Sequence, residues 1–144
     1  GRVIAALVRE FARRGSRAQM VNNLGTQGYF SLMAQAAAMV GNSSSGIIEA
    51  PSFGLPVVNI GTRQRGRTRG PNVIDVGYTC DEILAGITQA TSPGFRASLL
   101  GSPNPYGSGH ASDVIVRHLK EVPLDDRLVR KRFLDFPAAL SPVA

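Results

Sequence analysis

The sequence of 144 residues predicts an α/β fold in which helices cover both faces of a parallel sheet. Short apolar runs alternate with stretches of helical periodicity, as in strand–helix–strand units. Two of the runs, MVG at 39–41 and VVNI at 57–60, are short and nearly continuous, which is typical of strands buried on both faces. Tryptophan is absent and aromatic residues make up only 6% of the chain, so aliphatic side chains must fill the core.

The first forty residues predict two helices separated by an extended run. Apolar side chains recur at helical spacing over residues 3–14, and Gly15 ends that pattern. Residues 19–24 form a short extended run that stops at Gly25. The alanine-rich segment 29–38 favours a helix, because alanine has the highest helix propensity.

The rest of the chain continues the alternation. The predicted elements after the strand at 39–41 are a helix at 45–53, strands at 56–60 and 72–77, and helices at 81–90 and 110–120. Gly54 ends the first of these helices, and Thr79 or Cys80 is expected near the cap of the helix at 81–90. The segment GSPNPYGSG at 101–109 predicts a loop.

We expect one domain over residues 1–121 and a loosely ordered, proline-containing tail over residues 122–144. The chain begins with Gly1 in the middle of a helical pattern, so we expect an upstream part to be missing from it.

Composition narrows the classes of function. The formal net charge is +6, but the arginines are dispersed and lack the interleaved aromatic residues of single-strand binders, which disfavours nucleic acid. The single Cys80 excludes an internal disulfide and a cysteine metal cluster, and we predict no metal site and a cytoplasmic location. No apolar stretch approaches the roughly 20 residues of a membrane span.

Hydroxyl side chains gather where the strand at 39–41 meets the following helix. Asn42 and Ser43, Ser44 and Ser45 all lie in this loop. One interpretation is helix capping, in which such side chains accept free backbone N–H bonds. The other is an anion site, since a helix start presents N–H groups and small hydroxyls let a phosphate approach.

A carboxylate and an arginine cluster follow. Glu49 lies on an otherwise apolar helix, either as a solvated first-turn charge or as an acceptor for two sugar hydroxyls such as those of ribose. Arg63, Arg65 and Arg67 follow the strand at 56–60, either as a solvated loop or as guanidinium groups for an anion. Because the strands are parallel, both loops are expected at the same ligand-binding edge of the sheet.

These motifs resemble one enzyme family. GNSSSGIIEAPSFGLPVVNIGTRQRGR followed by NVIDV is similar to the hydrolysing UDP-N-acetylglucosamine 2-epimerases, and NLGTQGYFSLMAQAAAMV and NPYGSGHAS fit the same family. The non-hydrolysing epimerases would show Asp-Ser-Gly-Gly in place of residues 42–45. The resemblance implies a Rossmann-like domain, the carboxyl-terminal half of a glycosyltransferase-B (GT-B) arrangement that binds UDP.

The resemblance also implies roles for single residues. Ser43 and Ser44 match the positions that hold the diphosphate, and Glu49 matches the carboxylate on the ribose hydroxyls. Arg63 matches an arginine at the nucleotide site, with Arg67 as its neighbour. The implied partners are UDP-N-acetylglucosamine or UDP, the missing amino-terminal domain and, in the full-length protein, a second copy in a homodimer. No cofactor is implied.

In the family reaction, UDP is eliminated to give a 2-acetamidoglucal, and water adds to yield N-acetylmannosamine. The resemblance places the acid and base groups mainly on the amino-terminal domain, with a histidine early in this one. The chain departs from that pattern because no histidine precedes His110; His110 and His118 read as ordinary helix residues. Ser108 also stands where an acidic residue is common. Two alternatives remain: a non-catalytic nucleotide-sugar-binding module and the carboxyl-terminal domain of a glycosyltransferase.

Overall fold

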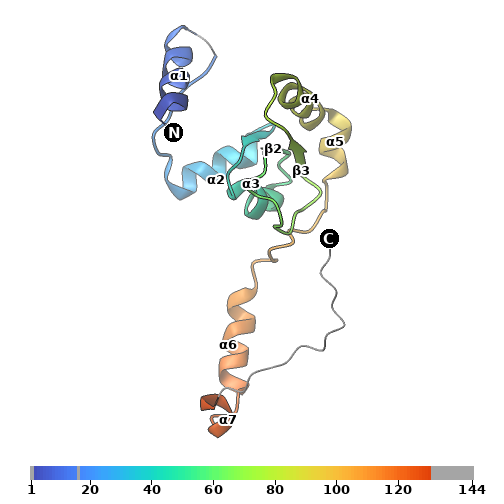
Figure 1. The fold of residues 1–144 in the computed structure, drawn as a ribbon. Helices are drawn as coiled ribbons and strands as arrows, with labels where there is room; N and C mark the ends of the chain where they lie inside the picture. Colours follow the sequence, from blue (N-terminus) through green and yellow to red (C-terminus); the bar gives the residue numbers. More distant parts are fainter. Residues whose placement is uncertain (1, 16, 131–144) are drawn as a thin grey trace. The chain divides into compact units, whose positions relative to one another are not determined.

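The computed structural model describes residues 2–15 and 17–130 (Figure 1). The chain divides into two compact units, Gly1–Tyr106 and Gly107–Ala144, which are considered separately. The first unit holds the sheet and the sequence motifs at residues 42–67. Over the described residues, no helix has the length and apolar character needed to cross a membrane.

The first helix, α1 (Arg2–Arg13), confirms the amphipathic pattern at the start of the chain. The predicted extended run at 19–24 is wrong, because those residues form neither strand nor helix. They lead instead into α2 (Gly25–Gln35). This helix begins four residues before the predicted helix at 29–38 and ends three residues before it. The Asn23 side chain accepts the Gly25 N–H at 2.8 Å, and this local turn replaces a strand at the helix entry.

The sheet has three parallel strands in the order β1–β2–β3. These are β1 (Met39–Gly41), β2 (Val57–Ile60) and β3 (Val73–Val76). Met39 pairs with Val57, which pairs with Val73, so the strands start in register. All three were predicted from the sequence, although the second was predicted to begin one residue early and the third to extend one residue further at each end. The result is the expected α/β, Rossmann-like architecture.

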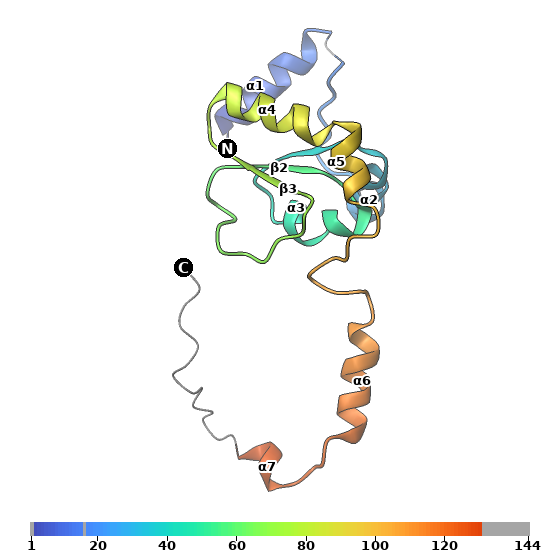
Figure 2. The ribbon, with the colours of Figure 1, turned by 90° about the vertical axis from the view of Figure 1, so that its right-hand side faces the viewer.

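Helices cover both faces of the central strand. Val57 and Val58 point to opposite faces, because successive side chains of a strand alternate. A Cβ at Gly46 would lie 2.8 Å from Val57, and one at Gly86 would lie 2.9 Å from Val58. The two glycines therefore bring α3 (Ser45–Ile48) and α4 (Cys80–Ala90) close to opposite faces of β2, as Figure 2 shows.

The predicted helix at 45–53 is two pieces. The α-helix α3 ends at Ile48, and a 3₁₀-helix, η1 (Ala50–Phe53), continues from it. Pro51 explains the break, because proline has no N–H to donate to the carbonyl four residues earlier. Gly54 then ends η1 in the left-handed conformation with φ +55°. The core under these two pieces is aliphatic, as the composition indicated, and contains Met33, Ala50, Leu55 and Val57.

A capping box begins α4. The hydroxyl of Thr79 accepts the Glu82 N–H at 3.3 Å, and the Glu82 carboxylate accepts the Thr79 N–H at 3.1 Å. Bonds from the Thr79 hydroxyl and backbone also lower the pKa of the Glu82 carboxyl. Thr79, one of the two expected residues, is thus the cap. A further helix, α5 (Pro93–Ser98), follows and was not predicted.

The second unit contains α6 (Ala111–Glu121) and α7 (Asp126–Val129). The first of these confirms the predicted helix at 110–120. Within the predicted tail at 122–144, α7 is a single turn whose cap is Asp125, which accepts the Arg127 N–H at 2.9 Å. Residues 131–144 of that tail lie outside the described residues.

Replacing Gly86 should test the close approach of α4 to the sheet. We expect Gly86→Val to lower the free energy of unfolding by about 2 kcal/mol or more, since new methyl groups would overlap Val58 and Val76, whose methyls already lie 2.8–2.9 Å from a Cβ. Gly94→Val in α5 is the matched control, because a Cβ there has nothing within 4 Å. Chemical denaturation of both variants would measure the difference, and equal stabilities would contradict this packing.

Candidate functional site

The loops that follow the three strands meet at one edge of the sheet. Parallel pairing places the ends of β1, β2 and β3 on the same side. The buried Gln64, after β2, donates from Nε2 to the Asn42 carbonyl, after β1, at 2.8 Å. The loop after β1 (residues 42–45, the serine loop) and the loop between β2 and β3 (residues 61–72, the arginine loop) are therefore neighbours, as the strand order predicted.

The three serines of the serine loop differ in their hydrogen bonds. The Ser43 hydroxyl accepts the Ser45 N–H at 3.3 Å, so capping explains part of this motif. Ser44 occupies the cap position of α3 without a side-chain capping bond. The Ser45 hydroxyl accepts a bond from the Tyr29 hydroxyl at 2.9 Å, which ties the loop to α2. Of the three, Ser43 is exposed, and Ser44 and Ser45 are half-buried.

Glu49 is not a solvated first-turn charge. It lies between the two helices, as the C-cap of α3 and the N-cap of η1, and not in the first turn of α3. Its side chain is half-buried, and its Oε2 atom is buried with no hydrogen-bond partner among the described residues. A buried carboxylate oxygen without a donor is unfavourable, so a donor supplied by water or by a ligand would stabilise this atom.

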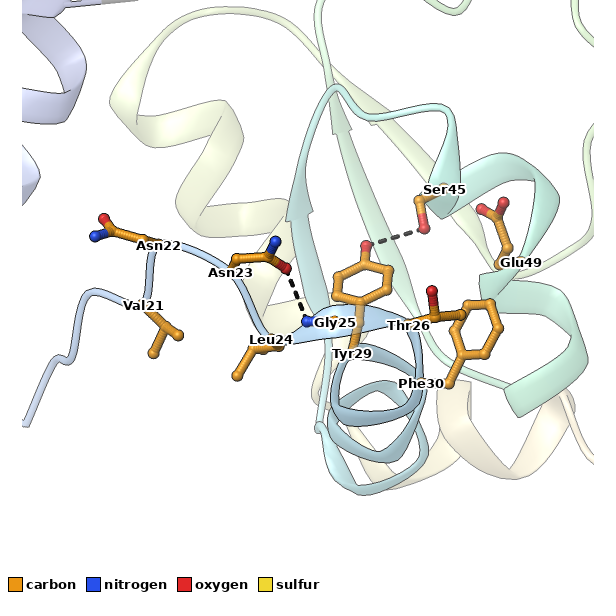
Figure 3. A pocket seen from close by; sticks show the side chains of 10 residues that line it. All are labelled: Val21, Asn22, Asn23, Leu24, Gly25, Thr26, Tyr29, Phe30, Ser45 and Glu49. Carbon is orange, nitrogen blue, oxygen red and sulfur yellow. Dashed lines mark hydrogen bonds between the residues drawn. The ribbon is translucent and has the colours of Figure 1, made fainter.

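A pocket of about 680 Å³ lies beside Glu49 (Figure 3). Glu49 and Ser45 line it from the α3 side, and Thr26 and Phe30 line it from α2. The remaining lining residues belong to the entry of α2 and to its first turns: Val21, Asn22, Asn23, Leu24, Gly25 and Tyr29. The unpartnered carboxylate thus borders a space large enough for part of a nucleotide.

The structure does not bring all the predicted residues into this pocket. Ser43, Ser44, Arg63 and Arg67 are absent from its lining. Arg63 and Arg67 are exposed on the loop after β2, so their guanidinium groups are open to solvent and to any anion. Both interpretations of the arginine cluster, a solvated loop and an anion site, therefore remain open.

Polar contacts hold the arginine loop in place. Arg69 donates to the Gln64 carbonyl at 2.9 Å and forms an ion pair with Asp75 of β3. Asp75 also accepts a bond from the buried Asn59 of β2 at 2.7 Å. This network connects β2, β3 and the loop between them, so Arg69 has a structural partner that Arg63 and Arg67 lack in the described structure.

The arginine loop begins with a close aromatic contact. Gly61 has φ +77°, and a Cβ there would lie 2.3 Å from the Tyr78 ring, so only glycine fits. The Thr62 N–H donates to the Tyr78 hydroxyl at 3.3 Å. Hydrogen bonding to Thr62 lowers the pKa of Tyr78, with a smaller contribution from the charge of Arg65.

The two histidines lie in the second unit. His110 Nδ1 is 3.6 Å from the Asp113 carboxylate, one turn along α6, and both side chains are exposed. The sequence motifs had placed no carboxylate beside either histidine, so this pair is an addition to the prediction. Neither histidine lines the pocket beside Glu49. Within the described ranges, no cluster of three or more His, Cys, Asp or Glu side chains is placed to hold a metal ion.

Sequence reasoning missed the α2 side of the pocket. Asn23, Thr26 and Tyr29 border the same space as Glu49, but the sequence assigned Asn23 only to an extended run, Tyr29 only to a helix, and Thr26 to no element. The available signal was the Asn-x-Gly spacing at Asn23 and Gly25, which is typical of a turn made by an asparagine side chain. No sequence pattern indicated hydrogen bonds between distant residues, such as the one between Tyr29 and Ser45.

A family model described as UDP-N-acetylglucosamine 2-epimerase matches residues 1–120 of the chain. A UDP-N,N'-diacetylbacillosamine 2-epimerase (hydrolysing) from Legionella pneumophila is 38% identical over 132 residues, which are 91% of this chain and 33% of the relative. A GDP/UDP-N,N'-diacetylbacillosamine 2-epimerase (hydrolysing) from Campylobacter jejuni is 39% identical over 137 residues, or 94% and 35%. Polysialic acid biosynthesis protein P7 from Escherichia coli is 36% identical over 112 residues, or 78% and 29%.

The chain spans about a third of the length of the curated relatives that it matches. The matched region includes the serine loop, Glu49, the arginine loop and both sides of the pocket. The family model covers most of the chain, from the first helix to the end of α6. The chain therefore belongs to the UDP-N-acetylglucosamine 2-epimerase family.

Proposed function

We propose that this chain supplies the UDP-binding half of a hydrolysing UDP-N-acetylglucosamine 2-epimerase, which forms N-acetylmannosamine and UDP. In this proposal a preceding Rossmann-like half completes a GT-B arrangement, and the full-length protein is a cytoplasmic homodimer. Family membership and the share of the relatives that the chain spans support the proposal.

The observation that carries the proposal is the Glu49 carboxylate. Its buried Oε2 atom lacks a donor in the described structure, and the residue lines a pocket with room for part of a nucleotide. A ribose offers two adjacent hydroxyl donors, and a carboxylate can accept both. We therefore assign Glu49 to the ribose hydroxyls, which would supply the missing hydrogen bonds.

We assign the diphosphate to the two loops beside the pocket. Ser43 and Ser44 offer hydroxyl groups at the end of β1, and Arg63 and Arg67 offer exposed cations at the end of β2. The bond from Gln64 to Asn42 keeps these loops adjacent. Arginine suits phosphate because its guanidinium presents several N–H donors in one plane.

This half-site would assist the departure of UDP. The leaving group gains negative charge as its bond to sugar carbon 1 breaks, and donors on the diphosphate stabilise that charge. Removal of the proton from carbon 2 requires a base within hydrogen-bond reach. Glu49 and Tyr29 are the titratable residues lining the pocket, and Glu49 is assigned to the ribose. We therefore place the acid and base groups outside this chain.

A second sugar substrate is supported by the relatives. Two of them, at 38% and 39% identity, are named for UDP-N,N'-diacetylbacillosamine rather than UDP-N-acetylglucosamine. Both substrates share the UDP group, so the residues assigned above would serve either. Comparing the two sugar nucleotides with the full-length enzyme would decide between them. A binding module without chemistry and a glycosyltransferase domain would share the same half-site but show no epimerase activity in the full-length protein.

Binding of UDP tests the proposal directly. The chain is expected to bind UDP weakly, because the contacts of the opposing half are missing. Isothermal titration calorimetry of the folded chain with millimolar UDP should give saturable heat, whereas uridine without phosphates should bind more weakly. A folded chain that gives no heat with UDP would exclude this half-site.

Glu49→Gln should separate the ribose from the phosphates. Glutamine keeps one of the two carboxylate oxygens as an acceptor and replaces the other by an NH₂ group. One charge-assisted hydrogen bond to the ribose is then lost, so the free energy of UDP binding should weaken by about 1.5–3 kcal/mol. Pyrophosphate has no ribose, and its affinity should be retained. Glu121→Gln on α6 is the control for the same change in charge. Equal losses for UDP and pyrophosphate would show that Glu49 acts on the loop structure instead.

The chain alone should not convert UDP-N-acetylglucosamine to N-acetylmannosamine and UDP. Electrostatic help at the diphosphate leaves the proton on carbon 2 when no base is in reach. Adding a separately expressed amino-terminal half from a relative should restore some turnover. Incorporation of solvent deuterium at carbon 2 by the chain alone would contradict this assignment and require a base within it.

A further inference from the structure

The loop at residues 103–106 contacts both the helical segment around Glu49 and the arginine loop. Asn104 Nδ2 donates to the Ile48 carbonyl at 2.8 Å and to the Ser52 hydroxyl at 2.7 Å. Two residues later, the Tyr106 hydroxyl donates to the Thr68 carbonyl at 2.9 Å. All these contacts lie within the first unit, although they join residues 38 to 56 positions apart.

Asn104 contacts residues on either side of Glu49 in the sequence. Ile48 is the last residue of α3, and Ser52 lies in η1, so the two accept from the same side chain on either side of the Glu49 turn. The Glu49 carbonyl itself accepts the Ser52 N–H at 3.0 Å. Asn104 therefore bridges the junction at which Pro51 interrupts the helix and which would otherwise have fewer backbone bonds.

The loop itself is stiff. Pro103 and Pro105 flank Asn104, and each ring restricts φ at its own position and the conformation of the residue before it. The Asn104 Oδ1 atom also accepts the Tyr106 N–H at 2.9 Å, which closes a local turn. Asn104 is half-buried and has little freedom to leave its two acceptors.

We propose that residues 103–106 form a strap that positions the UDP site: Asn104 holds Glu49 toward the ribose, and Tyr106 holds the arginine loop toward the diphosphate. Both are positioning residues that need not touch the ligand. The proposal rests on the proposed function, because it assigns the two ends of the strap to the two parts of UDP. It predicts that substitutions at the two ends have different effects on the affinities for UDP and for pyrophosphate.

Asn104→Asp tests the first end. The variant keeps the oxygen that accepts the Tyr106 N–H but replaces the donor facing the Ile48 carbonyl by an acceptor. UDP affinity should fall about fivefold or more, the loss of roughly one hydrogen bond, while pyrophosphate affinity changes less. The added negative charge repels pyrophosphate as well as UDP, so charge alone would not produce this selectivity. Asn104→Ala should show the same selectivity without the charge.

Tyr106→Phe tests the second end and is the matched variant within the strap. Losing the bond to the Thr68 carbonyl should weaken UDP and pyrophosphate by the same factor, because both use the arginine loop. A general loss of structure would instead lower both affinities in all variants. Thermal unfolding of each variant would measure that loss.

Hydrogen exchange on the ligand-free chain gives a readout independent of binding. Asn104→Asp should speed exchange of the Ser52 N–H and leave that of Val57, bonded to the Asn72 carbonyl at 2.8 Å, unchanged. Absence of UDP binding by the unsubstituted chain would overturn the proposed function, and the strap's role in UDP binding with it. Two results would overturn the strap alone. One is an unchanged ratio of UDP affinity to pyrophosphate affinity in the Asn104 variants, and the other is an unchanged exchange rate of the Ser52 N–H.

Discussion

The parallel pairing of β2 with both neighbours is the constraint on which the rest of this structure depends. In a parallel sheet, helices commonly cover both faces of the central strand, and its side chains alternate between those faces. Gly46 and Gly86 allow α3 and α4 to approach Val57 and Val58 closely. The same pairing brings the ends of all three strands to one edge, which is why residues far apart in sequence converge on one site.

The site combines a rigid part with an open part. Around the arginine loop, Arg69 and Asp75 form an ion pair, and Gln64 bonds to the serine loop. Glu49 has one oxygen that is buried without a donor in the described structure, as have Gln64 and Asn72, and of these three residues Glu49 lines the pocket. A folded chain tolerates such an atom where a ligand supplies the missing bond, and the neighbouring pocket has room for one.

The division of labour in the proposed enzyme follows from this arrangement. Donors for an anionic leaving group are present on the two loops, whereas the pocket lining contains no histidine. Binding of the nucleotide and movement of the proton would then reside on different parts of the full-length protein. Such a division is common where a substrate lies between two domains, since each domain can hold one end of it.

Much of the fold was predictable from local pattern. The strands at 39–41 and 57–60 are short apolar runs between turn residues, and Thr79 and Glu82 have the spacing of a capping box. The run at 19–24 was misread because the Asn23 side chain makes a turn there and no strand is available to pair with it. The α5 helix was missed because it is a short helix whose only start signals are Ser92 and Pro93.

The sequence by itself determined the α/β class, the order of the strands along the chain and the residue types at their ends, because periodicity and turn chemistry act over a few residues. It also indicated Glu49 as a candidate acceptor. Only the tertiary structure decided that Glu49 has a buried oxygen and lines a pocket, that Tyr29 bonds to Ser45, and that Asn104 bridges the Glu49 turn. The physical reason is that hydrogen bonds between residues 16 to 56 positions apart depend on how the elements pack, which no local pattern encodes.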